Sequence, residues 1–319
     1  MSPHRTANVA LCIACACWGL SFPLEQALLL DQAHDFPGVS TWCLSAWGLC
    51  LRFILAALIL ALCCRRSLGR PSASEWKQGL GLGVLTAGGM LLQMDALLHA
   101  PASTVAFLSQ CYAVWIPVFL AIKRRRMPSA PVLLCILAVL AGVTVLSGID
   151  LNHIALGRGE LESLLGSLVF SGLILWTELE AFSANRTTLV TLISFAAAAV
   201  AFLPVVAATT SEPMTLVRLY ADAARLAVLA VLAGVATCLG LLLMFRWQRH
   251  VGATAAAIIY CTEPIYASLF AFLLPAVLSA IFGIPFVREE LTISLIVGGG
   301  LILGAALIAQ RRSLSHAVG

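Results

Sequence analysis

Apolar segments of about 20 residues follow one another along nearly the whole chain. Each is long enough for a helix to cross the hydrocarbon core of a bilayer, and only short connections separate them. The segments cover residues 8–30, 42–63, 76–98, 102–122, 129–149, 161–179, 188–208, 225–245, 252–275 and 291–310. The pattern predicts an all-α, polytopic membrane protein with about ten transmembrane helices.

Composition excludes most other classes of protein. Of the 319 residues, 61% are hydrophobic and 11% are charged, against about 25% charged in an ordinary globular protein. The net charge of +4 does not indicate nucleic-acid binding, because the Lys and Arg residues lie in short clusters between the apolar segments. We therefore expect membrane lipids around the protein and no nucleic acid as a partner.

Basic residues favour one side of the membrane, because Lys and Arg resist translocation. Alternate connections and both ends of the chain carry Arg5, Arg65, Arg66, Arg70, Lys77, Lys123, Arg124, Arg125, Arg126, Arg186, Arg246, Arg249, Arg311 and Arg312. The opposite connections are mainly acidic. We predict a multi-pass protein of the cytoplasmic (inner) membrane with both termini in the cytoplasm, which requires an even number of spans.

Cysteines and motifs do not indicate catalysis. Most of the eleven cysteines lie inside apolar segments, where they act as small apolar side chains. Cys12, Cys15 and Cys17 lie close together, but no second pair of ligands is near them, so we expect no metal site. The sequence has no glycine-rich phosphate loop, nucleophile elbow or zinc-ligand spacing. We expect no catalytic residue and no cofactor.

The two halves of the chain resemble each other. At an offset of 150 residues the fourth apolar segment aligns with the ninth, and at an offset of 158 Trp18 aligns with Trp176. We predict two five-helix repeats, residues 1–150 and 151–319. Because five is odd, the second repeat enters the membrane from the opposite side, as in the inverted repeats of many transporters.

Charged residues inside apolar segments are the first candidates for function, because charge is costly in a bilayer and usually faces a cavity or the bundle interior. The sequence has Glu25, Arg52, Asp95, Glu178 and Glu263. Glu263 precedes Pro264, whose ring removes a helical hydrogen bond and opens backbone carbonyls at membrane depth. We expect Glu263 to lie in a cavity; the alternative is a buried pair with Arg52. Arg52 is too deep to reach either surface, so it pairs with a carboxylate or meets an anionic ligand.

Two other acids, Glu25 and Asp95, each allow two interpretations. Glu25 shares a helical face with Trp18 and Phe22, so it either closes an aromatic wall or lies at the external interface. Asp95 lies one turn before His99, and the two form either a proton relay or a hydrogen-bonded cap.

Several polar and small residues inside the apolar segments are candidates for helix packing. Gln110 and Tyr112 lie on the fourth apolar segment in a small and polar stripe, which either packs closely or lines a cavity. Two G-x-x-x-G spacings permit close helix contact, which we expect within the bundle rather than between protomers. They comprise Gly79, Gly83, Gly300 and Gly304. We expect Glu180 to pair with Arg186.

Several short motifs, in this order, resemble the EamA-type transporters of the drug/metabolite transporter superfamily. They are Trp18-Gly19 with Ser21-Phe22, Leu51-Arg52-Phe53, Ala102-Ser103-Thr104, Gly159-Glu160-Leu161, Gly252-Ala253-Thr254 with Glu263-Pro264, and Glu290-Leu291-Thr292. The resemblance implies ten helices in two inverted halves, a central cavity and alternating access, often for export of amino acids or other metabolites. Residues 275–288 depart from the pattern as a long apolar insertion, which either follows the outer interface or covers the cavity mouth.

We therefore predict a secondary transporter that exports a small metabolite, either an amino acid or similar polar or amphipathic solute, or a drug-like compound. The first, fourth, sixth and ninth spans are expected to line its cavity. The predicted substrate-binding residues are Trp18, Phe22, Glu25, Arg52, Gln110, Tyr112, Trp176, Tyr260 and Glu263. The predicted proton-coupling residues are Glu25, Asp95, His99 and Glu263.

Two rival functions stay open. One is an intramembrane enzyme that acts on a lipid-linked substrate, for which His99 is the candidate. The other is a non-transporting membrane scaffold that assembles through its glycine faces. The oligomeric state is either a monomer or a homodimer.

Overall fold

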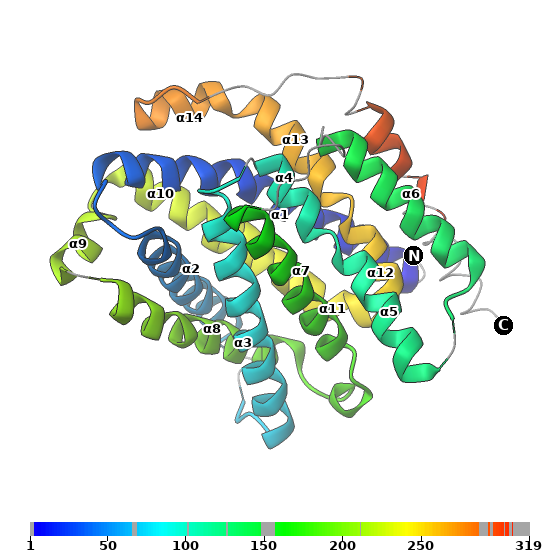
Figure 1. The fold of residues 1–319 in the computed structure, drawn as a ribbon. Helices are drawn as coiled ribbons and strands as arrows, with labels where there is room; N and C mark the ends of the chain where they lie inside the picture. The colour runs from blue at the N-terminus through cyan, green and yellow to red at the C-terminus, as the bar shows by residue number, and fades with distance from the viewer. Residues whose placement is uncertain are drawn as a thin grey trace.

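The computed structural model describes residues 3–65, 69–100, 102–125, 127–147, 157–210, 212–286 and parts of 293–308. Every regular element in these residues is helical, and the helices pack into one bundle (Figure 1). Among the described residues, six helices are long and apolar enough, by length and composition, to cross a membrane. They cover Arg5–Asp35, Thr41–Cys64, Arg158–Thr177, Thr187–Thr209, Ala223–His250 and Ala253–Leu273. The predicted all-α, polytopic membrane fold is confirmed.

The first nine predicted spans each overlap one or more described helices. The first half holds α1 (Pro3–Asp35), α2 (Thr41–Cys64), α3 (Ala73–Ala96), α4 (Ala102–Ser109), α5 (Tyr112–Arg124) and α6 (Ala130–Ser147). The second half holds α7 (Arg158–Thr177), α8 (Thr187–Thr209), α9 (Pro213–Arg218), α10 (Ala223–Val231), a π-helical segment (Leu232–Leu239), α11 (Gly240–Trp247), α12 (Ala253–Tyr260), α13 (Glu263–Leu273) and α14 (Pro275–Phe282). Most of the predicted tenth span, and Arg288, Glu289 and Glu290 before it, lie outside the described residues. The count of ten spans and the inverted repeat therefore stay predictions.

Two predicted spans are each divided into two helices. The ninth is interrupted between Tyr260 and Glu263, because Pro264 in the first turn of α13 has no N–H to continue the hydrogen-bond ladder. The fourth is interrupted between Ser109 and Tyr112, and the sequence did not predict this break. Both helix ends before the breaks, and both helix starts after them, are 151 positions apart.

Close packing of α3 on α8 depends on two glycines. A Cβ added at Gly79 would lie 2.6 Å from Ile193, and one added at Gly83 would lie 2.5 Å from Ala197. Both distances are shorter than a side chain permits, so the expected G-x-x-x-G contact within the bundle is confirmed at this pair.

The start of α3 carries a charged cluster that ties it to α8. Ser72 caps the helix and accepts a hydrogen bond from the backbone N of Glu75 at 3.2 Å. Arg186 donates from Nε to Oε1 of Glu75 at 2.8 Å. This guanidinium lowers the pKa of Glu75, which precedes the third predicted span, to about 2. We call Glu75 and Arg186 the α3 clamp. The predicted pair of Glu180 with Arg186 is wrong, because Glu75 holds this side chain.

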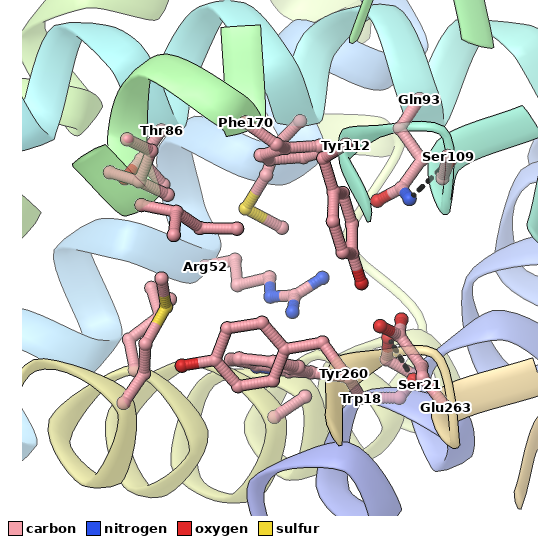
Figure 2. A pocket seen from close by; sticks show the side chains of 16 residues that line it. Trp18, Ser21, Arg52, Thr86, Gln93, Ser109, Tyr112, Phe170, Tyr260 and Glu263 are labelled. Atoms are coloured by element: carbon pink, nitrogen blue, oxygen red, sulfur yellow. Dashed lines mark hydrogen bonds between the residues drawn. The ribbon is translucent and has the colours of Figure 1, made fainter. Parts of the chain in front are cut away.

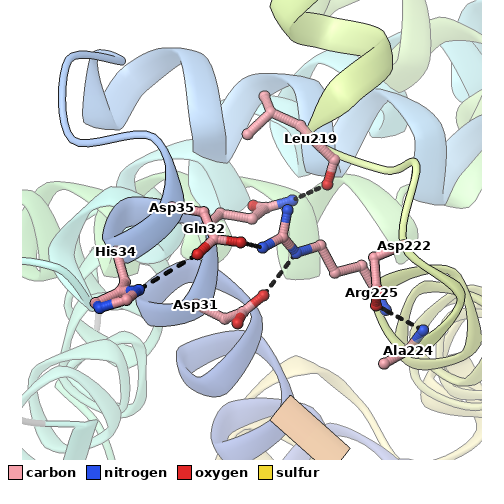
Figure 3. Close-up of polar contacts among 8 residues, drawn as sticks. All are labelled: Asp31, Gln32, His34, Asp35, Leu219, Asp222, Ala224 and Arg225. Atoms are coloured by element: carbon pink, nitrogen blue, oxygen red, sulfur yellow. Dashed lines mark hydrogen bonds and ion pairs between the residues drawn. The ribbon is translucent and has the colours of Figure 1, made fainter. Parts of the chain in front are cut away.

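The start of α10 carries a second cluster (Figure 3). Asp222 caps the helix and accepts hydrogen bonds from the backbone N atoms of Ala224 and Arg225, at 2.8 and 3.2 Å. Arg225 donates from Nε to Oδ2 of Asp31 at 2.6 Å, and a second nitrogen donates to Asp35. We call Arg225, Asp31 and Asp35 the α10 clamp. It ties the end of α1 to the start of α10.

Candidate functional site

A cavity lies inside the bundle (Figure 2). Its lining consists of Trp18, Ser21, Arg52, Thr86, Met90, Gln93, Ser109, Tyr112, Phe170, Leu173, Ile174, Ala236, Leu241, Met244, Tyr260 and Glu263. Small-molecule sites are typically concave and mainly apolar with a few fixed polar groups. This cavity has both properties, so it is the candidate site.

Both broken helices place an aromatic residue beside the cavity. Tyr260 is the last residue of α12, and Tyr112 is the first residue of α5. The centroid of the Tyr260 ring lies 5.4 Å from that of Trp18 and 6.4 Å from that of Tyr112, with interplanar angles of 69° and 80°. Edge-to-face contacts of this kind fix the ring orientations. The three rings therefore form a preorganised aromatic wall.

Arg52 on α2 lines the cavity and is already paired. Its side chain is 3% exposed, and it donates hydrogen bonds to the carboxylate of Glu25 on α1 and to the hydroxyl of Thr237. Of the two interpretations of Arg52, pairing with a carboxylate is the one that the structure contains. Glu25 is 4% exposed at its side chain, so it is buried in the bundle and does not lie at the external interface.

Glu263 is the other charged residue of the lining, and it is placed differently. It begins α13 and is 8% exposed. Gln110 accepts a hydrogen bond from the hydroxyl of Tyr112 and contacts Glu263 through a side-chain hydrogen bond. In the described part of the chain no basic side chain pairs with Glu263, and the alternative of a pair with Arg52 is wrong, because Arg52 is held by Glu25.

Comparison with known proteins assigns a family to the first half of this bundle. Residues 5–148 match the model of the EamA-like transporter family. They form an EamA-like transporter domain. The resemblance to EamA-type transporters of the drug/metabolite transporter superfamily is thereby confirmed, and the function is that of a membrane transporter.

Two further comparisons bear on the fold. A solved crystal structure aligns with 97% of this chain and 98% of its own chain, with a TM-score of 0.66 and 17% sequence identity. This likeness shows a common fold across nearly the whole length. No curated protein matches the chain.

Residues of the EamA-like domain and of the second half of the chain both line the cavity. Trp18, Arg52 and Tyr112 come from the domain, whereas Tyr260 and Glu263 come from α12 and α13. These five are the predicted substrate-binding residues that line the cavity.

The other four predicted substrate-binding residues do not line it. Glu25 and Gln110 lie behind it and contact Arg52 and Glu263, as described above. Phe22 is buried in the core. Trp176 packs against Phe182 and donates a hydrogen bond from its indole to the backbone O of Gln78 at 3.3 Å. Its indole is directed to α3 because Gly81 leaves room for it: an added Cβ there would lie 2.6 Å from the ring.

Asp95 and His99 belong to a separate ion cluster. Oδ2 of Asp95 lies 3.4 Å from Nε2 of His99 and accepts a hydrogen bond from Arg158, whose Nε also donates to Glu162 at 2.8 Å. Neither Asp95 nor His99 lines the cavity. The sequence analysis did not identify Arg158 as the partner of Asp95, because this contact joins α3 to the start of α7, 63 positions later.

The first, fourth, sixth and ninth predicted spans all contribute to the lining, and so do the second, third and eighth, which were not among the expected spans. From α3 come Thr86, Met90 and Gln93, and from α11 come Leu241 and Met244. Gln93 donates a hydrogen bond to Ser109 at 3.0 Å across the cavity wall. A glutamine inside an apolar segment was the available signal, since buried amides need partners.

Residues 275–286, the described part of the apolar insertion, include α14 and do not line the cavity. Leu278 is buried, whereas Val277 and Ile281 are 52% and 45% exposed. Exposed apolar side chains on a surface helix fit the outer-interface interpretation better than a lid.

Proposed function

We propose that this protein is a secondary transporter that exports a small metabolite or drug-like solute across the cytoplasmic membrane by alternating access. The carrying observation is the cavity with Glu263 and Arg52, which opens where two spans are broken and is shared between the EamA-like domain and the second half. Broken helices that expose polar groups at membrane depth are typical of transporter binding sites.

Positional correspondences support the proposal of two inverted halves, residues 1–150 and 151–319. The helix breaks recur at an interval of 151 positions. The two N-caps, Ser72 and Asp222, are 150 positions apart, as are the clamp residues Glu75 and Arg225. The α3 clamp joins the start of the third span to the connection between the sixth and seventh spans. The α10 clamp joins the start of the eighth span to the end of the first span.

In this proposal the cavity residues have distinct roles. Trp18, Tyr112 and Tyr260 form the wall against which the solute packs, and Glu263 and Arg52 are the polar anchors. The sequence has no nucleotide-binding motif, so an ion gradient or the gradient of the solute drives transport. Among the four predicted proton-coupling residues, geometry favours Glu263, because it alone lines the cavity.

No observation favours the two rival functions. An enzyme would need a reactive group at the cavity, and His99 contacts Asp95 instead. A scaffold has no need of a carboxylate without a basic partner beside an internal cavity.

Ligand-induced stabilisation of the detergent-purified protein tests the proposed function. Amino acids, sugars, nucleosides and cationic drugs are added in turn, and the melting temperature is measured for the wild type, for Glu263→Gln and for the exposed control Glu180→Gln. We expect one solute class to stabilise the wild type and the control but not Glu263→Gln. Equal stabilisation of all three would remove Glu263 from the site, and stabilisation by no class would contradict the proposal.

A further inference from the structure

We propose that the cavity selects monovalent organic cations, with the charged nitrogen against Glu263 and an apolar body against the rings of Trp18, Tyr112 and Tyr260. This inference rests on the proposed transport function and adds a substrate class to it.

The charge balance of the cavity is the first step. Arg52 contributes one positive charge, and the carboxylate of Glu25 contacts it directly. Glu263 is a second carboxyl group at 8% exposure, and no basic side chain of the described chain pairs with it. A buried carboxylate is stable only when a positive group or a proton compensates it. Without a ligand, a proton on Glu263 compensates the site, and a cationic ligand can take the place of that proton.

Anionic and zwitterionic ligands fit this balance less well. An anion would add a third negative charge beside Glu25 and Glu263, and it could reach Arg52 only in competition with Glu25, which already holds the guanidinium. A zwitterion would leave the net charge unchanged. A ligand with one positive charge neutralises the site and displaces no existing pair.

Aromatic surfaces are the second step, and they are independent of the charge count. Cations are attracted to the negative faces of Trp and Tyr rings. Trp18 meets Tyr260 edge to face, so the rings present surfaces in different directions around the same space. Figure 2 shows Trp18 and Glu263 on the same side of the cavity. They are brought together because α1 packs tightly on α13 at Gly19, where an added Cβ would lie 2.5 Å from Tyr266.

The apolar part of the cavity lining indicates the chemistry of the uncharged part of the ligand. Met90, Met244, Phe170 and Leu173 surround the remaining space and offer no charge. Methionine and aromatic side chains adapt to varied apolar shapes. The expected ligand therefore combines one cationic nitrogen with an aromatic or aliphatic body.

The test uses four probes that share a phenylethyl body and differ in charge: phenethyltrimethylammonium, 2-phenylethanol, 3-phenylpropionate and phenylalanine. Dissociation constants are measured by isothermal titration calorimetry on the full-length protein in detergent. We expect the cation to bind at least tenfold more tightly than each of the other three. In Glu263→Gln this preference over 2-phenylethanol should disappear, whereas Glu263→Asp and Glu180→Gln should retain it.

The ring contribution is tested with Trp18→Leu, which keeps an apolar side chain without a π face. We expect it to weaken binding of the cation several-fold more than binding of 2-phenylethanol, because both probes lose apolar contact and only the cation loses a π face. Preferred binding of phenylalanine or 3-phenylpropionate, equal binding of all four probes, or binding of none would overturn the cation inference. Counterflow of solutes in proteoliposomes separates this failure from that of the proposed function: transport of a neutral solute with no cation binding refutes only the substrate class, and cation binding without any counterflow refutes only transport.

Discussion

The α10 clamp and the charged residues of the cavity contain the same kinds of groups in different arrangements. Each has one arginine and two carboxylates. In the clamp both Asp31 and Asp35 contact Arg225. In the cavity Arg52 contacts Glu25, and the second acid, Glu263, contacts no basic group of the described chain.

Exposure explains what this difference means. The second acid of the clamp, Asp35, has a side chain that is 49% exposed and lies 3.3 Å from Nδ1 of His34, so water and this imidazole stabilise the second negative charge. Glu263 is 8% exposed, so water does not stabilise a charge on its carboxyl group. An excess charge in solvent is harmless, whereas an excess charge in a buried cavity requires a ligand or a proton. The charges of the α10 clamp are therefore compensated without a ligand, whereas the carboxyl group of Glu263 needs a ligand or a proton.

The largest expected effect is at the buried pair of the cavity. Arg52→Met should destabilise the protein by about 5 kcal/mol, because it leaves Glu25 buried without its partner next to a second carboxylate. Unfolding in a mixed-detergent titration measures this. The double variant Glu25→Gln with Arg52→Met should recover more than half of the loss. Wild-type stability of Arg52→Met would show that the pair of Arg52 with Glu25 does not stabilise the protein.

The clamp should respond with a smaller loss. Arg225→Met should cost about 3 kcal/mol, because Asp31 stays buried while Asp35 keeps its solvent. The same titration applies, with Asp31→Asn added to Arg225→Met as the rescue. A loss larger than that of Arg52→Met would reverse the comparison of the two regions.

The unpaired acid should behave in the opposite direction. Glu263→Gln should raise the stability of the ligand-free protein by about 1 kcal/mol, because it replaces a carboxyl group that has no basic partner and is costly to ionise when buried. Thermal unfolding without added solute provides the measurement, and Glu180→Gln is the control with no expected change. Destabilisation by Glu263→Gln would mean that an unseen partner already compensates this carboxylate.

The α3 clamp should give stability a dependence on acid pH. Arg186 lowers the pKa of Glu75 from 4.5 to about 2, so its contribution is fully present above pH 4.5 and is lost as the pH falls toward 2. The melting temperature of the wild type should therefore fall more steeply between pH 5 and pH 3 than that of Glu75→Gln. Parallel curves for the two proteins would contradict the low pKa.

The smallest effect is expected at the exposed acid of the α10 clamp. Asp35→Asn should change the free energy of unfolding by less than about 1 kcal/mol, because exposed ion pairs contribute little. Addition of salt should reduce even this difference. An effect as large as that of Arg225→Met would show that Asp35 is not stabilised by solvent as proposed.

Much of this arrangement could be predicted from the sequence, because it depends on local patterns. Apolar length predicts the helices, and Pro264 predicts the break before α13. The mid-span position of Arg52 indicates a buried pair but does not identify the partner, since both Glu25 and Glu263 are chemically suitable. Gln110 and Tyr112 mark the fourth span, yet no proline lies at the break between Ser109 and Tyr112 to predict it.

Long-range packing decided the rest. Trp176 aligns with Trp18 in the sequence comparison, but it packs on Gly81 and so lies outside the cavity lining. Arg158 reaches Asp95 across 63 positions, and no local pattern of residues reports such a contact. The contribution of α3 was missed because Thr86 and Met90 are ordinary residues of an apolar helix.

Solute counterflow in proteoliposomes tests the central claim most directly. Vesicles preloaded with unlabelled phenethyltrimethylammonium and diluted into the labelled compound are compared for wild type, Glu263→Gln and Glu180→Gln. We predict transient accumulation of label with the wild type and Glu180→Gln, and none with Glu263→Gln. Equal accumulation with Glu263→Gln, at equal protein content, would contradict the assignment of the cavity as the path of the solute.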